Sequence, residues 1–366
     1  MSRLTGLEDG PVVCFATQGH GHIEGQRIRQ LLELVGAESY PFDRAHKLRS
    51  AIGLVAMARK RRPRLIVMEG TGTAGGVTLM LIDALLGIPY VVSSGDAVGP
   101  YLALRSRAIG FAGGLYERLL CRRSAGFIGW TPYLVGRALA FGAPRGMSAP
   151  GWTRSRAAAG ARAEVRGRLG IPAEALVVGL TGSIQFSPRR GYIYGSELVS
   201  AIRRCERSDV VACIVGDGSG LERLKQLAGE DLGTRVFLPG RVAPSEVPDH
   251  LAAFDLASLS QSVDQVGSFR YTTKLSEYLA AELPVITGET PLSYDLDEGY
   301  FWRLPGAAPW SADYQDALTG LLESLSSEEI SHRREAVLQR RADPFDMLVQ
   351  QRRARDFIAD LLVSRR

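Results

Sequence analysis

A lysine and a glutamate three positions apart, Lys274 and Glu277, are well suited to bind an anionic ligand. They lie in the segment YTTKLSEYLAAELPVI, residues 271–286, whose apolar spacing predicts a helix followed by a short strand. Residues three apart share one face of a helix. Lys274 would offer a positive charge to phosphate, and the two oxygens of Glu277 would accept both hydroxyls of a ribose. The alternative is a simple surface ion pair between the two side chains.

Neighbouring groups would extend this anion site. Gly267 and Ser268 precede the predicted helix, and the amide N–H groups at a helix N-terminus bind phosphate. Upstream, the loop GSIQFSPRRG, residues 182–191, follows a predicted strand and carries Arg189 and Arg190. These arginines would add positive charge near the phosphates, the alternative being a basic surface loop without a ligand.

Two glycine turns follow predicted strands in the same half of the chain. The first, VGDGSG at residues 215–220, places Gly216 at a strand end, although turns of this kind occur in many loops. The second, FLPGR at residues 237–241, ends in Gly240 and Arg241. Both turns would let a ligand approach the backbone closely.

Together these segments resemble the KLxEYxAxxxPVI motif and the glycine turns of retaining glycosyltransferases with the GT-B fold, the group 1 or family 4-like enzymes. The resemblance covers residues 176–287 well and the first half only in architecture. It implies an α/β fold of the GT-B type, with two Rossmann-like doubly wound domains and an interdomain cleft. It also implies that Glu277 binds the donor ribose and Lys274 its phosphates.

The other donor-side residues follow from the resemblance by position. Arg190 stands where the family has a phosphate-binding lysine, and Gly240 and Arg241 stand where relatives contact the nucleobase. The donor-binding residues that we expect are Gly182, Ser183, Arg189, Arg190, Gly216, Gly240, Arg241, Gly267, Ser268, Lys274 and Glu277.

Two positions depart from the family pattern. Ser183 replaces the usual arginine, and Phe269 replaces a glutamate that normally contacts the transferred sugar. Asp264, or backbone groups of residues 265–268, are the candidates to take the place of that glutamate. The departures leave open whether this chain is an enzyme or a binding protein.

The first half offers a glycine-rich loop as a candidate acceptor site. GHGHIE, residues 19–24, follows a predicted strand and opens a helix, so Gly19, His20 and Gly21 would approach a sugar or phosphate closely. His20 and His22 have the chemistry of metal ligands, but no third ligand lies nearby in the sequence. We therefore expect no metal here.

Two carboxylates at later strand ends complete the acceptor-side candidates. Asp96 would orient the acceptor hydroxyl or accept its proton, and Glu69 would bind the acceptor. A helix cap for Asp96 and a simple turn role for Glu69 are the alternatives. With Lys274 and Arg190 stabilising the departing nucleoside diphosphate, Asp96 completes the expected catalytic set.

Short strands separated by helices position these residues, and this alternation predicts parallel sheets with right-handed crossovers. The pattern is also helical from 111 to 140, apart from one short strand. The expected strands are 12–17, 65–68, 88–93, 126–130, 176–181, 210–215, 236–238, 256–259 and 283–287. The expected helices are 23–35, 77–86, 196–204, 221–227 and 345–364.

A length of 366 residues favours two domains. A stretch rich in Ala, Gly, Ser and Arg between 147 and 168 marks the linker. We therefore predict an acceptor-binding domain at 1–160 and a nucleotide-sugar-binding domain at 161–344. The helix predicted within 345–366 either caps the second domain or crosses back to the first.

Charge is distributed unevenly along the chain. Up to Pro150, 18 Lys and Arg face 10 Asp and Glu, whereas the remainder holds 26 against 29. The basic half includes a cluster at 59–64 and Arg118, Arg122 and Arg123. Such clusters suit a phosphorylated acceptor or an anionic membrane surface, and a solvated surface is the alternative.

Cysteine usage and hydropathy bear on localisation. Four cysteines without a CxxC pair predict reduced thiols in the cytosol. The apolar run 77–92 is too short to span a bilayer and contains Asp83, and no early segment has the form of a signal peptide. We expect a cytoplasmic protein, either free or peripherally attached to the inner membrane.

The predicted activity is that of a hexosyltransferase-type glycosyltransferase, which moves a sugar from a nucleotide-sugar donor to an acceptor hydroxyl in polysaccharide, glycolipid or related synthesis. The resemblance alone implies retention of configuration. The expected partners are the donor and a sugar or lipid-linked acceptor, with no nucleic acid, no metal and no cofactor besides the nucleotide-sugar co-substrate. A nucleotide-sugar epimerase and a catalytically silent binding protein remain open. A nicotinamide-dependent oxidoreductase is disfavoured, because the first strand-helix loop lacks the full G-x-G-x-x-G pattern.

Overall fold

A computed structural model describes residues 10–153, 156–340 and 344–363 of the chain. The chain divides into two compact units. The N-terminal unit contains the described residues up to Gly151 together with the segments Phe269–Tyr271 and 344–363. The C-terminal unit contains the described residues of 152–268 and 272–340.

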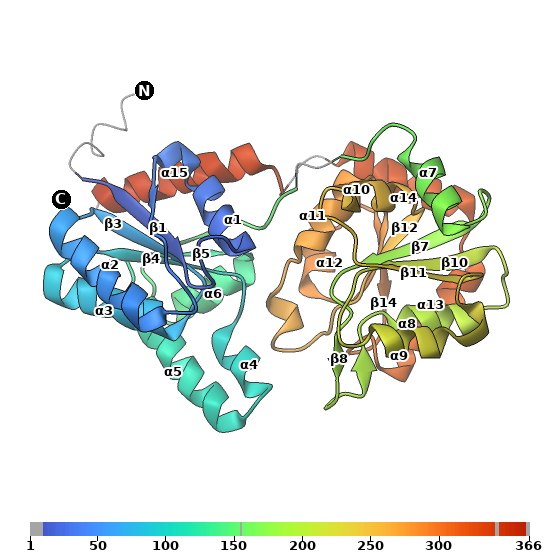
Figure 1. The fold of residues 1–366 in the computed structure, drawn as a ribbon, viewed down its shortest axis with the longest axis horizontal. Coiled ribbons are helices and arrows are strands. Elements are labelled where there is room, and N and C mark those ends of the chain that lie inside the picture. Colours follow the sequence, from blue (N-terminus) through green and yellow to red (C-terminus); the bar gives the residue numbers. More distant parts are fainter. Residues whose placement is uncertain (1–9, 154–155, 341–343, 364–366) are drawn as a thin grey trace. The chain divides into compact units, whose positions relative to one another are not determined.

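The N-terminal unit is built on a six-stranded parallel sheet of order β2-β1-β3-β4-β5-β6. Its first strand lies inside the sheet, so the right-handed crossovers put α1 on one face and α2, α3 and α5 on the other (Figure 1). The strands are β1 (Val12–Ala16), β2 (Glu38–Ser39), β3 (Leu65–Glu69), β4 (Tyr90–Ser94), β5 (Gly126–Gly129) and β6 (Gly146–Ser148). The helices are α1 (Ile23–Leu31), α2 (Lys47–Arg61), α3 (Thr73–Leu86), α4 (Val98–Ala103), α5 (Arg107–Arg123), α6 (Pro132–Ala140) and α15 (Met347–Val363).

The C-terminal unit holds a second six-stranded parallel sheet, of order β11-β10-β7-β12-β13-β14. An antiparallel hairpin of β8 (Phe186–Ser187) and β9 (Tyr192–Ile193) follows β7. The other strands are β7 (Leu176–Thr181), β10 (Val210–Val215), β11 (Val236–Gly240), β12 (Leu256–Leu259), β13 (Val285–Gly288) and β14 (Phe301–Leu304). The helices are α7 (Ala161–Leu169), α8 (Ser196–Arg204), α9 (Leu221–Ala228), α10 (Val247–Ala252), α11 (Thr273–Ala280), α12 (Pro291–Asp295), α13 (Ala312–Ser324) and α14 (Ser327–Gln339).

Both sheets are covered by helices on two faces, which explains why their strands are apolar along their whole length. All residues of β1, β3, β4, β7 and β10 are buried. The expected fold class, two doubly wound α/β sheets, is confirmed. The predicted bounds of β7, β10, β12 and α8 agree with the structure residue for residue.

One helix starts four residues earlier than predicted: α3 begins at Thr73 and not at 77. Gly75 and Gly76 belong to the first turns of this helix because they pack tightly against neighbouring elements. A Cβ at Gly76 would lie 2.0 Å from the Tyr116 hydroxyl, and one at Gly75 would lie 2.9 Å from a Thr17 methyl. These glycines allow close packing, whereas the sequence pattern alone indicated a loop.

Several elements were not predicted at all. The sequence of α2 ends in a basic cluster, which hides its apolar periodicity. The strands β2 and β14 are short, and α10, α12, α13 and α14 lie between or after predicted strands. The predicted helix 23–35 ends earlier, at Leu31, and continues as a separate 3-10 turn, Glu33–Val35.

The helix α15 packs in the N-terminal unit against α1. The side-chain amide of Gln351 donates a 2.7 Å hydrogen bond to the carbonyl of Gln30. A Cβ on Gly126 would lie 2.8 Å from the ring of Phe357. The helix α15 therefore packs directly on β5. Figure 1 shows α15 and α1 on the same face of the sheet.

All four cysteines are buried and unpaired. Burial raises the pKa of the Cys14 thiol to about 11 and those of Cys121 and Cys213 to about 12. Among the described residues, no helix is long and apolar enough to cross a bilayer.

Candidate functional site

The strand order of the C-terminal unit reverses between β7 and β12, and ligands of open α/β sheets bind outside the strand ends at such a point. The helix α11 begins beside these ends. Its Tyr278 is fully buried and ties it to both strands, because its hydroxyl accepts the amide N–H of Thr181 at 3.0 Å and donates to the carbonyl of Ser258 at 3.4 Å. The tyrosine of the KLSEY segment therefore positions the lysine and glutamate that precede it.

Lys274 lies against the backbone turn that follows β7. Its ammonium donates a 2.9 Å hydrogen bond to the Tyr194 hydroxyl and sits 4.3 Å from the centroid of that ring. A Cβ at Gly182 would stand 2.6 Å from the Lys274 Nζ, and the φ of +142° at this position also favours glycine. Because Lys274 is directed onto Tyr194 and Gly182, a surface ion pair alone does not account for its position.

The two glycine turns of the site pack against each other. Gly216 follows β10 with a φ of +154°, and a Cβ on it would lie 1.8 Å from the carbonyl oxygen of Gly182. No other residue fits at this position without moving the β7 turn. The amide of Gly216 also donates to the carbonyl of Gly240 at 2.9 Å, which joins the ends of β10 and β11.

These elements surround a cavity of about 540 Å³, called here the glycine-turn pocket. It brings together six of the predicted donor-binding residues, Gly182, Ser183, Gly216, Arg241, Lys274 and Glu277. Its remaining lining residues are Thr181, Gln185, Val215, Asp217, Gly218, Val242, Val247 and Thr273.

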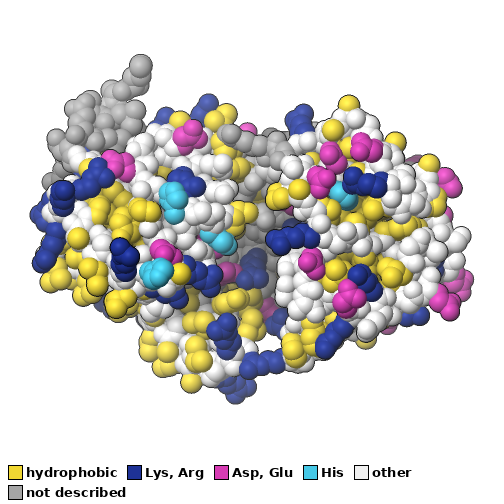
Figure 2. Space-filling model, viewed as in Figure 1, with side chains coloured by type: hydrophobic (Ala, Val, Ile, Leu, Met, Phe, Trp, Pro, Cys, Tyr) yellow, Lys and Arg dark blue, Asp and Glu magenta, His cyan; other side chains and the backbone are white. Residues whose placement is uncertain are grey.

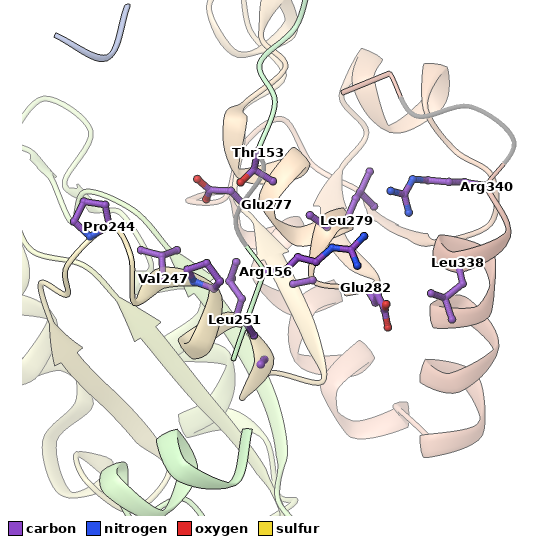
Figure 3. A pocket seen from close by; sticks show the side chains of 15 residues that line it. Thr153, Arg156, Pro244, Val247, Leu251, Glu277, Leu279, Glu282, Leu338 and Arg340 are labelled. Carbon is purple, nitrogen blue, oxygen red and sulfur yellow. The ribbon is translucent and has the colours of Figure 1, made fainter. Parts of the chain in front are cut away.

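Figure 3 shows a second cavity, of about 620 Å³. Val247 and Glu277 line both cavities. Arg156, Glu282 and Arg340 also line the second one. The Glu277 carboxylate therefore stands at the junction of the two spaces.

Glu277 has the chemistry of a ligand-binding carboxylate. Burial raises its pKa, and the positive charge of Lys274 partly offsets this by lowering it. None of the described residues donates a hydrogen bond to its carboxylate. A half-buried carboxylate of this kind is satisfied when ligand hydroxyls reach it.

The structure does not bring the predicted residues Arg189, Arg190 and Gly240 into the lining of the glycine-turn pocket. Arg189 and Arg190 lie in the turn between β8 and β9, and both are exposed. The Arg190 guanidinium lies 3.5 Å from Asp264 and 4.6 Å from the centroid of the Trp310 ring. Arg190 is therefore held against its own unit.

Gly267 and Ser268 also lie outside this lining, and their amides are already used. The Gly267 N–H donates to the Asp264 carboxylate at 2.8 Å, and the Ser268 N–H donates to the Asp264 carbonyl at 3.0 Å. The expectation that they offer free N–H groups to a diphosphate does not fit this geometry. The Asp264 carboxylate also accepts from Val266 and Ser262, so it orders its own loop.

Phe269, which stands where relatives have a glutamate, packs in the N-terminal unit. Its carbonyl accepts a 2.9 Å hydrogen bond from the Thr131 hydroxyl, and the Arg137 guanidinium lies 5.6 Å from its ring centroid. The next residue, Arg270, pairs with the Asp96 carboxylate at 2.8 and 2.5 Å. A role for Arg270 was not predicted from the sequence. The one feature that could have indicated it is its position next to Phe269.

The glycine-rich loop after β1 borders an open hollow of about 930 Å³. Gly19, His20 and Gly21, the predicted acceptor-binding residues of this loop, are among its lining residues. The ring of His22 accepts the amide N–H of Glu24 at 3.4 Å and caps α1, and the ring of His20 lies 3.1 Å from the Ser39 hydroxyl. The two histidines therefore have local structural partners.

Glu69 is buried and fully engaged. One of its oxygens pairs with Arg27 at 2.7 Å, and the other accepts the indole N–H of Trp130 at 3.0 Å. The Arg27 guanidinium also lies 4.5 Å from the centroid of the Trp130 ring. With 1% of its surface exposed, Glu69 offers no atom to an acceptor, so we assign it a structural role in place of the predicted binding role.

Glu24, in the glycine-rich segment 19–24, is a second residue for which the sequence pattern predicts no role. Its Oε2 atom is buried without a hydrogen-bond partner among the described residues, close to Gly70. Burial, with a smaller contribution from the charges of Glu69 and Asp96, raises its pKa to about 7 against the opposing effect of Arg27 and Arg44. In the sequence, Glu24 is only an acidic residue in the first turn of a helix, which indicates where the helix begins and nothing about a buried carboxyl group.

The Glu24→Gln variant should lack the decrease in stability that the wild type shows as the pH rises. The folded pKa of about 7 exceeds the ordinary value of 4.5, so protonation favours the folded state. This contribution is fully present below pH 4.5 and is lost as the pH rises through 7. In thermal unfolding scans, the Tm of the wild type should fall relative to that of the variant across this interval. A difference in Tm that stays constant with pH would contradict the assignment.

Two family models match the chain, one in each half. Residues 8–147 match the "Glycosyl transferase 4-like domain", and residues 175–306 match "Glycosyl transferases group 1". Comparison with curated protein sequences finds no match.

Solved structures share the fold over nearly the whole chain. The Alr3699/HepE protein of Anabaena in complex with UDP has a TM-score of 0.69 at 16% identity, covering 96% of this chain and 100% of its own. Sucrose-phosphate synthase from Thermosynechococcus elongatus has a TM-score of 0.70 at 15% identity, covering 97% and 100%. WaaG, a glycosyltransferase involved in lipopolysaccharide biosynthesis, has a TM-score of 0.67 at 13% identity, covering 94% and 99%. The chain therefore belongs to the group 1, family 4-like glycosyltransferases and has their GT-B fold.

Proposed function

We propose that the protein transfers a hexose from a nucleotide-sugar donor to an acceptor hydroxyl, with the donor nucleotide bound in the glycine-turn pocket. The observation that carries this proposal is the arrangement of Lys274 and Glu277. The ammonium lies against a bare glycine backbone, and the carboxylate faces the same cavity without a protein donor. A diphosphate would meet the first and a ribose diol the second.

The proposed chemistry is attack of the acceptor hydroxyl on the anomeric carbon of the donor sugar. The bond from that carbon to the diphosphate breaks, and the leaving group carries the electron pair. Lys274 would stabilise its negative charge, together with the N-terminal amides of α11. Retention of configuration is part of this proposal and follows the family resemblance. Because Arg190 is held by Asp264 and Trp310, its proposed contribution requires that it leave these partners.

On the acceptor side, the proposal concerns the N-terminal unit. Gly19, His20 and Gly21 border an open hollow that a sugar would fit. Arg270 binds the Oδ1 atom of the Asp96 carboxylate, and the aspartate side chain remains 48% exposed. Its second oxygen is the atom that would accept a hydrogen bond from the acceptor hydroxyl.

The donor to test first is UDP-glucose, since Anabaena structures similar to this chain hold UDP, UDP with glucose, or UDP-glucose. We expect a rise in Tm with UDP-, GDP- or ADP-linked sugars, and release of the nucleoside diphosphate that increases when an acceptor is added. Lys274→Ala should abolish release, whereas Lys225→Ala should not, because Lys225 pairs with Glu222 on α9, away from the pocket lining.

Each alternative has a distinct outcome in the same assay. Conversion of the donor sugar without an acceptor would indicate an epimerase. A Tm shift without nucleoside diphosphate release under any acceptor would indicate a binding protein. If no nucleotide sugar shifts the Tm, the proposed donor site is wrong.

A further inference from the structure

The helix α5 exposes several of its large apolar side chains. Phe111 and Leu115, four positions apart, are 71% and 54% exposed. Its buried positions include Gly110, against Ala103, and Gly113, against Leu102 of the adjacent α4, besides Glu117, Leu120 and Cys121. A surface helix of a globular protein normally shows the opposite pattern, with polar residues outward.

Two neighbouring helices also expose large apolar side chains. Leu81 and Leu85 point outward from α3, and Leu48 and Ile52 point outward from α2, with Leu48 76% and Leu85 73% exposed. The helix α2 packs beside α3, and α3 beside α5, on one face of the N-terminal sheet (Figure 1). The six side chains Leu48, Ile52, Leu81, Leu85, Phe111 and Leu115 therefore form one surface, called here the apolar helix face.

The charges around this face have one sign. Between residues 47 and 123 the chain holds twelve Lys and Arg but four Asp and Glu. Two of the four acids, Glu69 and Glu117, are buried in ion pairs with Arg27 and Arg137. In Figure 2, Lys and Arg side chains border the hydrophobic side chains in the region of α2, α3 and α5.

On α5 itself, Arg118 and Arg122 are exposed among the apolar residues. Arg118 lies about one helical turn after Leu115, and Arg122 lies about one turn after Leu119. Arginine side chains in this position extend along apolar surface and keep the guanidinium at its edge. The row therefore pairs an apolar strip with a cationic margin.

We propose that the apolar helix face docks the N-terminal unit onto an anionic phospholipid surface. Leucine and phenylalanine side chains enter the boundary between headgroups and acyl chains, and the arginines bind phosphate groups above it. No other occupant satisfies both features equally well. A twofold contact with a second copy would place cations against cations. A nucleic acid would meet the arginines but leave the leucines without an apolar partner.

Flotation with vesicles tests the proposal on the full chain. The protein should float with vesicles of equal parts phosphatidylglycerol and phosphatidylcholine at low salt, and less with phosphatidylcholine alone or at high salt. Leu115→Ser should lower the partition coefficient about tenfold, because the apolar area of one leucine no longer enters the bilayer. Arg118→Ala should lower it about fivefold, the effect of one cation near an anionic surface.

Leu348→Ser is the matched control. Leu348 is 52% exposed, close to the value for Leu115, but it lies on α15, which covers the other face of the same sheet. This variant should float like the wild type. All variants replace exposed residues, so their Tm values should stay near that of the wild type, and a large drop would call for the milder Leu115→Gln variant.

Three results would overturn the proposal. The first is absence of flotation with anionic vesicles at low salt. The second is an equal loss of flotation in Leu115→Ser and Leu348→Ser. The third is a stable dimer in light scattering that Phe111→Ser dissociates, which would make a second copy the occupant. The donor-binding assays use other residues, so failure here leaves the proposed transfer reaction untouched.

Discussion

Replacing Glu277 by alanine should weaken binding of the preferred nucleoside diphosphate about a hundredfold, because two hydrogen bonds from ribose hydroxyls to a charged acceptor are lost. The carboxylate lies at the junction of two cavities and receives no hydrogen bond from the described residues. Truncation thus removes no protein contact that holds the fold. Isothermal titration calorimetry of wild type and variant measures the effect directly, while the Tm without ligand should change little.

A ligand lacking one hydroxyl separates this explanation from general damage to the pocket. The wild type should bind UDP more tightly than 2′-deoxy-UDP, provided that UDP is the nucleotide it accepts. In Glu277→Ala the two ligands should bind alike, because the acceptor of the 2′-hydroxyl is gone. If the variant still distinguishes them to the same degree, Glu277 does not contact the ribose.

Glu69→Ala should lower the free energy of unfolding of the N-terminal unit by about 3–5 kcal/mol, the usual effect of leaving one partner of a buried ion pair alone. Desolvation already lowers the pKa of Arg27, and the charge and hydrogen bond of Glu69 are what oppose this. The variant also deprives the Trp130 indole of its acceptor. Thermal and urea unfolding followed by tryptophan fluorescence would measure the loss.

An exposed pair in the same unit provides the control. The Arg61 Nη2 atom lies 2.9 Å from the Glu38 Oε1 atom, but nearly half of each side chain is exposed. Because solvent screens such a pair, Glu38→Ala should change stability very little. If Glu69→Ala fails to fold, the double variant Arg27→Met/Glu69→Leu should restore a folded protein, since it removes the unpaired charge. Similar small effects of Glu69→Ala and Glu38→Ala would contradict the structural role.

The strands of both sheets could be predicted because burial on two faces leaves a strong signal in the sequence. The runs 176–181 and 210–215 are continuously apolar and end at glycine or a small polar residue, so their bounds were correct. Helix bounds were harder where glycine serves packing. The glycines of α3 stand against Tyr116 and Thr17, and neither contact is visible in a local window of sequence.

The site was predictable where one short segment carries it. Lys274 and Glu277 belong to one helix, so their spacing placed both at the same cavity. Arg190, in the turn between β8 and β9, does not line this cavity. Its guanidinium contacts Asp264, which is 74 positions away in the sequence. Long-range ion pairs of this kind depend on the folded arrangement of several loops. The same is true of Arg270 with Asp96, which are 174 positions apart.

The placement of α15 has a consequence for biosynthesis. This helix covers β5 and binds α1 through residues 321 positions apart, yet it follows the whole C-terminal unit in the chain. During translation the ribosome therefore completes the first sheet long before its cover exists. Until then, the face of β5 at Gly126 lacks the cover that Phe357 of α15 supplies, and the nascent unit needs either a chaperone or prompt folding of the intervening segment to avoid aggregation.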